Sequence, residues 1–216
     1  AAGGCNSSEI VGRLGSPWVF DDPGVWIKPH PNGALTHPGA GCLLALLSEH
    51  EVAPEKIARI SVKTNDRVLK TLIHHNPVDG MQAKFSMEFT LAIVAIERQA
   101  GLGEFTTDML NRTDVRAMMG KVDYAAYDAA GDGYTNVTTL IDVMLQDGQV
   151  FSGRADHARG STKAPMDFEE VAIKFRGCAT YCRHPDERIK SIETTVREMD
   201  KLDTADILVN TLVSKQ

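Results

Sequence analysis

Alternating apolar and polar residues in the middle of the chain predict a small β-sheet. In residues 57–63 and 137–145, apolar side chains recur at every second position, which is typical of half-buried strands. Asp147-Gly148 follows the second run, and another apolar run begins at residues 149–151. An Asp-Gly pair between two such runs is a strong hairpin signal, so we predict a hairpin here. Residues 68–73 fit either a weaker strand or a turn of helix.

Helical spacing of apolar residues predicts helices on both sides of these strands. Residues 40–47 are small and apolar and indicate a buried helix, with Thr36 or His37 near its first turn. Residues 81–100 contain neither glycine nor proline, and their apolar positions recur with helical periodicity. We therefore predict a single helix over residues 81–100, capped by Asp79.

The last quarter of the chain has a different, helical character. A polar, glycine-containing connection over residues 153–165 precedes a capping box that begins at Asp167. Further helices are predicted to start at Pro185 and at Thr204, each with one apolar stripe. We expect residues 1–160 to form an α+β domain with an antiparallel sheet. Residues 161–216 are expected to be C-terminal helices that dock against an all-helical body largely absent from this chain.

Composition and charge exclude several classes of protein. The chain has 216 residues, 43% of them hydrophobic, and a formal net charge of −6, which argues against a nucleic-acid-binding protein. Its apolar runs, such as residues 42–47, are far shorter than the roughly 20 residues of a membrane span. The first residues lack an initiator methionine and the features of a signal peptide, so we expect a cytoplasmic piece of a longer protein.

The four cysteines do not predict a metal centre. Cys5, Cys42, Cys178 and Cys182 match no zinc-site spacing, and without a secretory signal they are expected to be reduced thiols. Cys178 and Cys182 lie one helical turn apart, and we favour small buried hydrophobic residues over a metal or redox pair. The motifs of serine hydrolases, nucleotide-binding loops and helical zinc sites are also absent from the sequence.

A proline-rich segment, residues 28–38, concentrates groups capable of chemistry. Lys28 is suited to holding a substrate carboxylate, and His30 or His37 to acting as general acid or base near neutral pH. Asn32 and Thr36 add a carboxamide and a hydroxyl, and the prolines limit how far the loop can relax. The alternative is an ordinary surface loop in which Lys28 is solvated and His37 caps the next helix.

A second cluster lies at the start of the long predicted helix. Lys84 and Ser86 follow His74 and His75, and a helix N-terminus favours an anionic ligand. Residues two apart do not share a helix face, so both reach one ligand only at the helix end. The alternative is a Lys84–Glu88 surface ion pair, with the histidines in a turn.

Taken in order, these features resemble the C-terminal half of the MmgE/PrpD family. That family includes 2-methylcitrate dehydratase, cis-aconitate decarboxylase and iminodisuccinate epimerase. The matching features, which together span nearly the whole chain, are Trp26-Ile27-Lys28-Pro29-His30-Pro31, Leu35-Thr36-His37-Pro38, Asn76-Pro77, Ala83-Lys84-Phe85-Ser86, Asp147-Gly148 and Ala172-Ile173-Lys174-Phe175-Arg176.

The resemblance implies a two-domain enzyme with a large all-helical domain and a smaller α+β lid. Its members work without a redox or organic cofactor on di- and tricarboxylates, in a cleft between the domains. They remove or add water, as in propionate catabolism, move a proton next to a carboxylate, or release carbon dioxide. All three reactions pass through a carbanion-like or enol-like state, which cations and hydrogen-bond donors stabilise. The resemblance also implies a homodimer.

The family pattern can be transferred to individual residues. It implies that Lys28 and His37 are catalytic. It implies that Lys84 and Ser86 bind substrate at the helix start. His30, Asn32 and Thr36 are expected to bind substrate as neighbours of Lys28 and His37 in the same loop. Asn32-Gly33 replaces a histidine of the decarboxylase-like members, and Phe89 replaces a tyrosine of some relatives, so the epimerase and dehydratase members are the nearer match.

A different class of function is also compatible with the sequence. The chain would then be a truncated, non-catalytic module that binds carboxylates or assembles with a partner. Since the expected helical domain would supply further catalytic groups, we expect the chain alone to have little or no activity.

Overall fold

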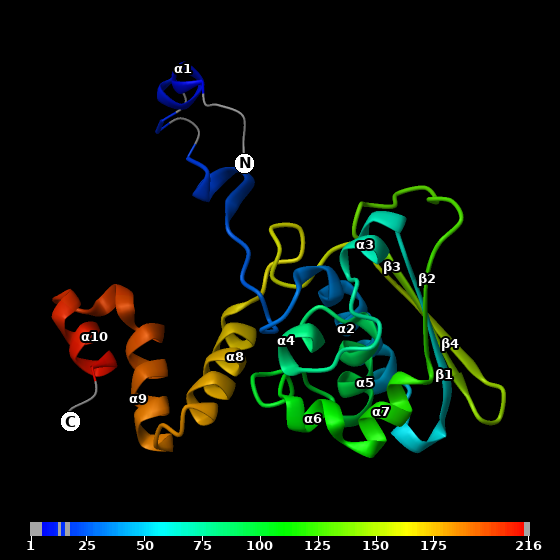
Figure 1. Cartoon of the computed structure of the whole chain (residues 1–216). Helices are drawn as coiled ribbons and strands as arrows, with labels where there is room; N and C mark the ends of the chain where they lie inside the picture. Colours follow the sequence, from blue (N-terminus) through cyan, green and yellow to red (C-terminus); the bar gives the residue numbers. More distant parts are fainter. Residues whose placement is uncertain (1–5, 13, 16–17, 214–216) are drawn as a thin grey trace.

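A computed structural model describes residues 6–12, 14–15 and 18–213 of the chain (Figure 1). The strands are β1 (Ile57–Thr64), β2 (Val122–Ala126), β3 (Thr139–Leu145) and β4 (Val150–Ala155). The helices are α1 (Ser7–Val11), α2 (His37–Glu49), α3 (Asp66–Thr71), α4 (Gly80–Ala83), α5 (Met87–Glu97), α6 (Thr107–Asn111), α7 (Thr113–Met119), α8 (Phe168–Tyr181), α9 (Asp186–Arg197) and α10 (Ala205–Leu212). Shorter helical turns occur at Phe20–Gly24, Ala34–Thr36, Pro54–Lys56 and Met199–Lys201.

The strands form one mixed sheet in the order β2-β1-β3-β4. The first predicted strand and the hairpin are confirmed: β1 pairs with β3, and β3 with β4, both antiparallel. Gly148 has a φ of 88°, the left-handed conformation that the hairpin turn requires. The sequence did not predict β2, which runs parallel to β1 and makes the sheet mixed. The predicted α+β class is confirmed.

Helices α2 and α5 cover one face of this sheet (Figure 1). Ile60 and Val62 of β1 pair with Val143 and Ile141 of β3, and all four side chains are buried. The packing follows from the period of two in the sequence, because alternate side chains of a strand point to the same face. The main hydrophobic core therefore lies between the sheet and α2 and α5.

The long helix predicted over residues 81–100 is wrong, because it is interrupted after α4. The Ser86 side chain accepts a hydrogen bond from the Phe89 N–H and so begins a new helix, α5. The carbonyl of Lys84 accepts a hydrogen bond from the Gly33 N–H at 2.8 Å instead of continuing the helix. Asp79 caps α4 as predicted, accepting from the Gln82 N–H.

Other helix predictions are confirmed. The buried helix predicted over residues 40–47 is α2, with Thr36 at its N-cap. Residues 68–73 fall mostly in α3 and therefore adopt the helical alternative rather than the strand. Helix α8 begins with the predicted capping box of Asp167 and Glu170.

The C-terminal helices α8–α10 and residues 18–27, which we call the N-terminal arm, project away from the sheet and its covering helices (Figure 1). Ile189 and Ile192 are buried between these helices, but many other apolar side chains are exposed; examples are Trp26, Ile173, Met199, Val209 and Leu212. In the part of the chain described, no helix combines the length and the hydropathy that a membrane crossing requires.

The cysteine predictions have a mixed outcome. Cys178 is half-buried, but Cys182 is exposed, because it follows the last turn of α8 where no other element covers it. The prediction of burial is therefore wrong for Cys182. Cys42 is half-buried on α2, and Cys5 lies outside the described residues.

Candidate functional site

The fold brings the two predicted clusters next to each other. The proline-rich loop runs along the junction between α4 and α5, where the Gly33 N–H donates to the Lys84 carbonyl. A Cβ atom at Gly33 would lie 3.3 Å from that carbonyl oxygen, so the close approach depends on glycine. The loop is held on a rigid surface, as precise positioning of functional groups requires.

A chain of buried hydrogen bonds fixes His37. Its Nε2 lies 2.8 Å from the Asn32 Oδ1. The Asn32 amide nitrogen donates to the hydroxyl oxygens of Thr36, at 2.8 Å, and of Thr90, at 3.1 Å. The Thr90 hydroxyl donates in turn to the Ser86 carbonyl at 2.8 Å. Because the amide nitrogen is the donor in both bonds, Oδ1 is an acceptor, and Nε2 of His37 must carry its hydrogen.

The hydrogen bonds therefore determine the tautomers of two neighbouring imidazoles. His37 donates through Nε2, which leaves Nδ1 as its basic nitrogen. His30 Nδ1 lies 3.1 Å from the Ala100 carbonyl and must donate to it, which leaves Nε2 as the basic nitrogen. The two rings meet edge to face with their centroids 5.3 Å apart. Two neutral imidazoles thus present one unprotonated nitrogen each.

The ionisable groups around His37 are basic. Burial lowers its pKa from 6.5 to about 3, and the neighbouring His30 imidazole and the charges of Lys28 and Lys174 act in the same direction, while the hydrogen bond to Asn32 opposes them. Burial also lowers the pKa of His30, although its bond to Ala100 acts the other way. A cationic surrounding of this kind favours an anionic ligand, whose charge would raise the pKa of His37 again.

Lys28 lies at the open side of this cluster. Its Nζ donates to the Asn32 carbonyl at 3.3 Å, while the side chain remains exposed. The structure thus brings Lys28, His30, Asn32, Thr36 and His37 together. The solvation of Lys28 agrees with the surface-loop alternative. His37 does not agree with it, because its side chain is 2% exposed and the N-cap of α2 is Thr36.

Lys84 and Ser86 join the cluster mainly through their backbones. Ser86 is fully buried, and its hydroxyl caps α5 and donates to Glu88. Glu88 is buried too, and its carboxylate lies 2.7 Å from Nδ1 of His75, so the alternative of a Lys84–Glu88 surface pair is wrong. Substrate contacts of Lys84 and Ser86 stay predictions.

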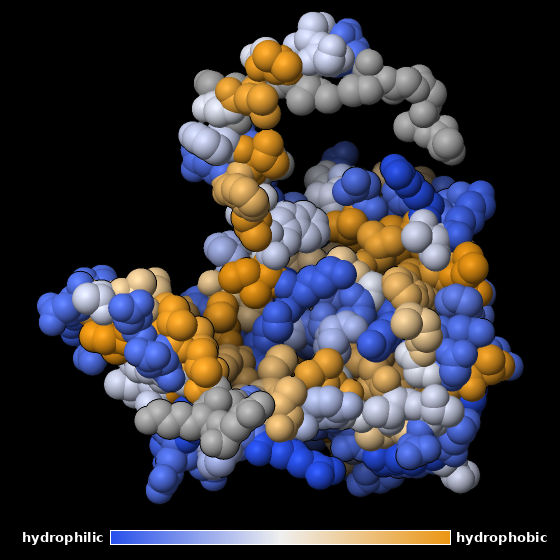
Figure 2. Space-filling model, turned by 60° about the vertical axis from the view of Figure 1, so that its left-hand side comes forward, coloured by the Kyte–Doolittle hydropathy of each residue, from blue (hydrophilic) through white to orange (hydrophobic). Residues whose placement is uncertain are grey.

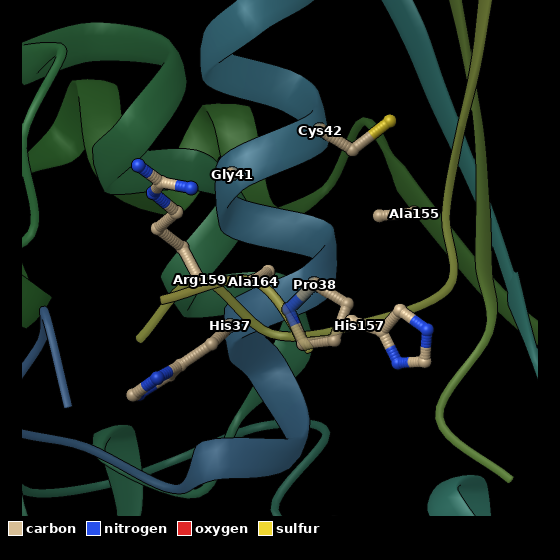
Figure 3. Close-up of a pocket in the computed structure, with 8 residues that line it drawn as sticks. All are labelled: His37, Pro38, Gly41, Cys42, Ala155, His157, Arg159 and Ala164. Atoms are coloured by element: carbon tan, nitrogen blue, oxygen red, sulfur yellow. The ribbon is translucent and has the colours of Figure 1, made fainter. Parts of the chain in front are cut away.

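A hollow of about 340 Å³ lies beside His37, between α2 and the segment after β4 (Figure 3). Its lining includes Cys42, His157 and Arg159. Figure 3 shows the rings of His37 and His157 extending to opposite sides of α2, so the fold does not pair them. Among the described residues, no three histidine, cysteine or acidic side chains converge as a metal site would require.

Comparisons with known proteins agree with this architecture. Residues 30–198 match the family model of the MmgE/PrpD C-terminal domain. The chain belongs to the MmgE/PrpD family. It is 24% identical over 204 residues to the cis-aconitate decarboxylase of Mus musculus, covering 90% of this chain and 41% of that protein. It is 23% identical over 212 residues to the human cis-aconitate decarboxylase, covering 95% and 44%. The chain thus spans less than half the length of these curated relatives.

One residue of this MmgE/PrpD chain near His37 was not proposed from the sequence. Lys174 lies on α8, far along the chain from the proline-rich loop, yet its charge acts on His37. Its segment, residues 172–176, contributed to the family resemblance, but nothing in that pattern indicated which loop α8 would approach. Only the tertiary structure associates this lysine with the site.

Proposed function

We propose that this chain forms the carboxylate-binding part of an MmgE/PrpD enzyme that dehydrates a small di- or tricarboxylate or moves a proton next to its carboxylate. The observation that carries the proposal is a buried, neutral His37, oriented by Asn32, among basic groups that include Lys28. In this proposal residues 1–160 act as the lid, and residues 161–216 belong to the helical domain.

The arrangement suits removal of a proton from the carbon next to a carboxylate. Nδ1 of His37 accepts the proton, and the electron pair left on carbon is delocalised into the carboxylate. Lys28 stabilises the negative charge that develops there, as fixed cations do in enzymes. The charge of a bound polycarboxylate raises the pKa of His37 from its low value in the free site, so the imidazole becomes a competent base when substrate is present.

Two features support dehydration or proton transfer over decarboxylation. Asn32-Gly33 replaces the histidine of decarboxylase-like members, and the structure commits Asn32 to orienting His37. Phe89 is fully buried against Phe105 and carries no hydroxyl where some relatives have tyrosine. The curated relatives are named decarboxylases, so measured activity has to decide between the reactions.

The proposal includes a helical domain that packs against this chain and closes the site. Figure 2 shows apolar side chains on the N-terminal arm, at the top, and on the C-terminal helices, at the left, next to a hydrophilic patch. Exposed residues such as Trp26 and Ile173 would be covered by a helical domain, which would also complete the catalytic groups. The exposed surfaces equally fit the alternative of a carboxylate-binding or assembly module without activity. A homodimer, a cytoplasmic location and work without a cofactor are part of the same proposal.

The test compares the full-length protein that contains this chain with the chain alone. Both are assayed against 2-methylcitrate, cis-aconitate and iminodisuccinate, with the variants Lys28→Ala and His37→Gln. We expect each variant to lower turnover of the full-length enzyme by about a hundredfold or more, whereas Lys190→Ala, on the exposed side of α9, leaves it unchanged. Unchanged turnover in His37→Gln would contradict the proposed base. Carboxylate binding without turnover by the full-length protein would favour the binding module.

A further inference from the structure

The peptide group between Ala100 and Gly101 is held by a side chain at each end. Its carbonyl, which belongs to Ala100, accepts the hydrogen bond from Nδ1 of His30 at 3.1 Å. Its N–H, which belongs to Gly101, donates to Oε2 of Glu104 at 2.6 Å. The C=O and the N–H of a trans peptide group point in opposite directions, so Glu104 and His30 lie on opposite sides of it. One peptide group thus connects a carboxylate with an imidazole of the site.

Glu104 is a buried carboxylate, and both of its oxygens accept hydrogen bonds. The residue is 8% exposed, and its Oε1 accepts from Nε2 of Gln99 at 2.9 Å, in addition to the bond from the Gly101 N–H. Burial of a carboxylate is costly unless its oxygens are hydrogen-bonded. Two donors therefore fix the carboxylate, and the carboxylate in turn fixes the direction of the Gly101 N–H.

The segment that carries this peptide group lies between two helices. Helix α5 ends at Glu97, Arg98 follows in the left-handed conformation with a φ of 58°, and α6 begins at Thr107. Residues 99–106 belong to neither a helix nor a strand, so no regular ladder of hydrogen bonds sets the orientation of their peptide groups. For the peptide group between Ala100 and Gly101, Glu104 supplies the fixed acceptor.

The orientation of this peptide group determines which nitrogen of His30 carries the hydrogen. A carbonyl oxygen beside Nδ1 accepts only from the Nδ1–H tautomer, which leaves Nε2 unprotonated. If the peptide group turned over, its N–H would face Nδ1 and favour the Nε2–H tautomer. Glu104 opposes that rotation, because the carboxylate would lose its N–H donor and face the negative end of the carbonyl dipole instead.

We propose that Glu104 is a positioning residue, which acts through this peptide group to keep Nε2 of His30 unprotonated, as a hydrogen-bond acceptor in the site. The inference rests on the proposed function for the role of His30 as a ligand-binding group. The rings of His30 and His37 meet edge to face with centroids 5.3 Å apart, so an ordered His30 also maintains the surroundings of the proposed base.

Nitrogen-15 NMR of the histidine side chains of the whole chain at neutral pH tests the inference, because the two tautomers differ in their Nδ1 and Nε2 shifts. We expect the Nδ1–H tautomer to predominate at His30. Glu104→Ala should shift the tautomer ratio about tenfold toward Nε2–H, as the loss of one hydrogen bond predicts. Glu104→Gln retains an acceptor for the Gly101 N–H and should keep most of the wild-type ratio. Asp108→Asn removes an exposed carboxylate on α6 and should leave the ratio unchanged.

The tautomer of His37 serves as an internal check on folding, because Asn32 sets it through a separate hydrogen bond. If Glu104→Ala leaves the ratio at His30 unchanged while His37 keeps its tautomer, the inference is overturned and the proposed function stands. A wild-type chain with His30 mainly in the Nε2–H tautomer overturns the inference without any variant. If Glu104→Ala disturbs His37 as well, turnover of the full-length enzyme decides.

A double-variant cycle in the full-length enzyme separates positioning from general stabilisation. Glu104→Ala should lower kcat/KM about tenfold, and this loss should vanish in a His30→Gln background, because Glu104 acts through that imidazole. Equal losses in the two backgrounds overturn the inference. If the wild-type full-length protein turns over none of the three candidate substrates, the proposed function is overturned, while the tautomer ratio still decides the role of Glu104.

Discussion

At the scale of single residues, burial of a neutral imidazole makes the stability of the chain depend on pH. Burial and the neighbouring cations lower the pKa of His37 from 6.5 to about 3 in the folded chain. Below the unfolded pKa, the unfolded chain binds a proton that the folded chain does not, so stability falls until the pH reaches the folded pKa. We expect His37 to account for a loss of about 2 kcal/mol between about pH 7 and pH 5.

Urea unfolding at a series of pH values measures this loss. His37→Gln should make the dependence on pH shallower in that window, because glutamine does not titrate. His157→Gln, at an exposed imidazole, serves as the control substitution. If His37→Gln and the wild type lose stability equally on acidification, His37 is not buried in its neutral form.

Thr90 is a second residue whose substitution should lower the free energy of unfolding by a definable amount. Its hydroxyl accepts a hydrogen bond from the Asn32 amide, and both side chains are buried. Thr90→Val keeps the shape but leaves that amide hydrogen unsatisfied, so we expect a loss of about 1–3 kcal/mol in the free energy of unfolding. Thr90→Ser retains the hydroxyl, so we expect a smaller loss of unfolding free energy, which comes from the missing methyl group. Equal losses in the two variants, measured by urea unfolding, would assign the effect to packing.

The predictability of the site follows from how its residues are distributed along the chain. Lys28, His30 and His37 lie within ten residues of a stiff loop, so the sequence indicated that they would be neighbours. Thr90 and Lys174 come from α5 and α8, and their proximity to the loop depends on tertiary packing that no local pattern encodes. The sequence also left open which side chains are exposed, because Lys28 and His37 belong to the same polar segment.

At the scale of elements, the start of α5 depends on a single hydroxyl. Ser86 Oγ accepts from the Phe89 N–H at 3.2 Å and donates to the buried Glu88. Ser86→Ala removes the N-cap and one partner of the carboxylate, so we expect a loss of about 1–2 kcal/mol in unfolding free energy, measured by thermal or urea unfolding. Ser86→Thr retains both bonds and serves as the control. A loss in Ser86→Thr as large as in Ser86→Ala would show that the hydroxyl is not the cause.

Two features of the fold, the break before α5 and strand β2, were not predicted from the sequence, and both omissions have physical reasons. The break before α5 lies in a stretch without glycine or proline, and it is stabilised by the Gly33 N–H, which comes from a distant loop. Strand β2 has five residues and runs parallel to β1; its burial alternates, but Ala125 and Ala126 end the apolar–polar alternation of the sequence after Tyr124, which leaves too short a pattern to predict a strand. In contrast, β1, the hairpin and the capping box of α8 are encoded by adjacent residues, and these predictions were confirmed.

At the scale of the whole molecule, the projecting segments predict self-association. Trp18 and Phe20 on the N-terminal arm are 68% and 82% exposed, and Val209 and Leu212 on α10 are 53% and 51% exposed. Apolar surface of this kind is rarely left in water by a monomer, so we expect the chain alone to form concentration-dependent dimers or larger species in sedimentation experiments.

Substitutions can test which surface the chain uses for self-association. Val209→Lys with Leu212→Lys places charge on α10, outside the core, and should shift the chain toward monomer without lowering its thermal stability. Val150→Lys introduces one lysine at a half-exposed position of the sheet edge, away from these helices, and should leave association unchanged, as should Val209→Lys or Leu212→Lys, each compared with it as single variants, if α10 is not the contact. A wild-type chain that stays monomeric over a wide concentration range with α8–α10 still helical would mean that these apolar stripes need no partner. That result would remove the main structural support for a helical domain packed across the site, because the exposure of α8–α10 is what makes such a domain necessary.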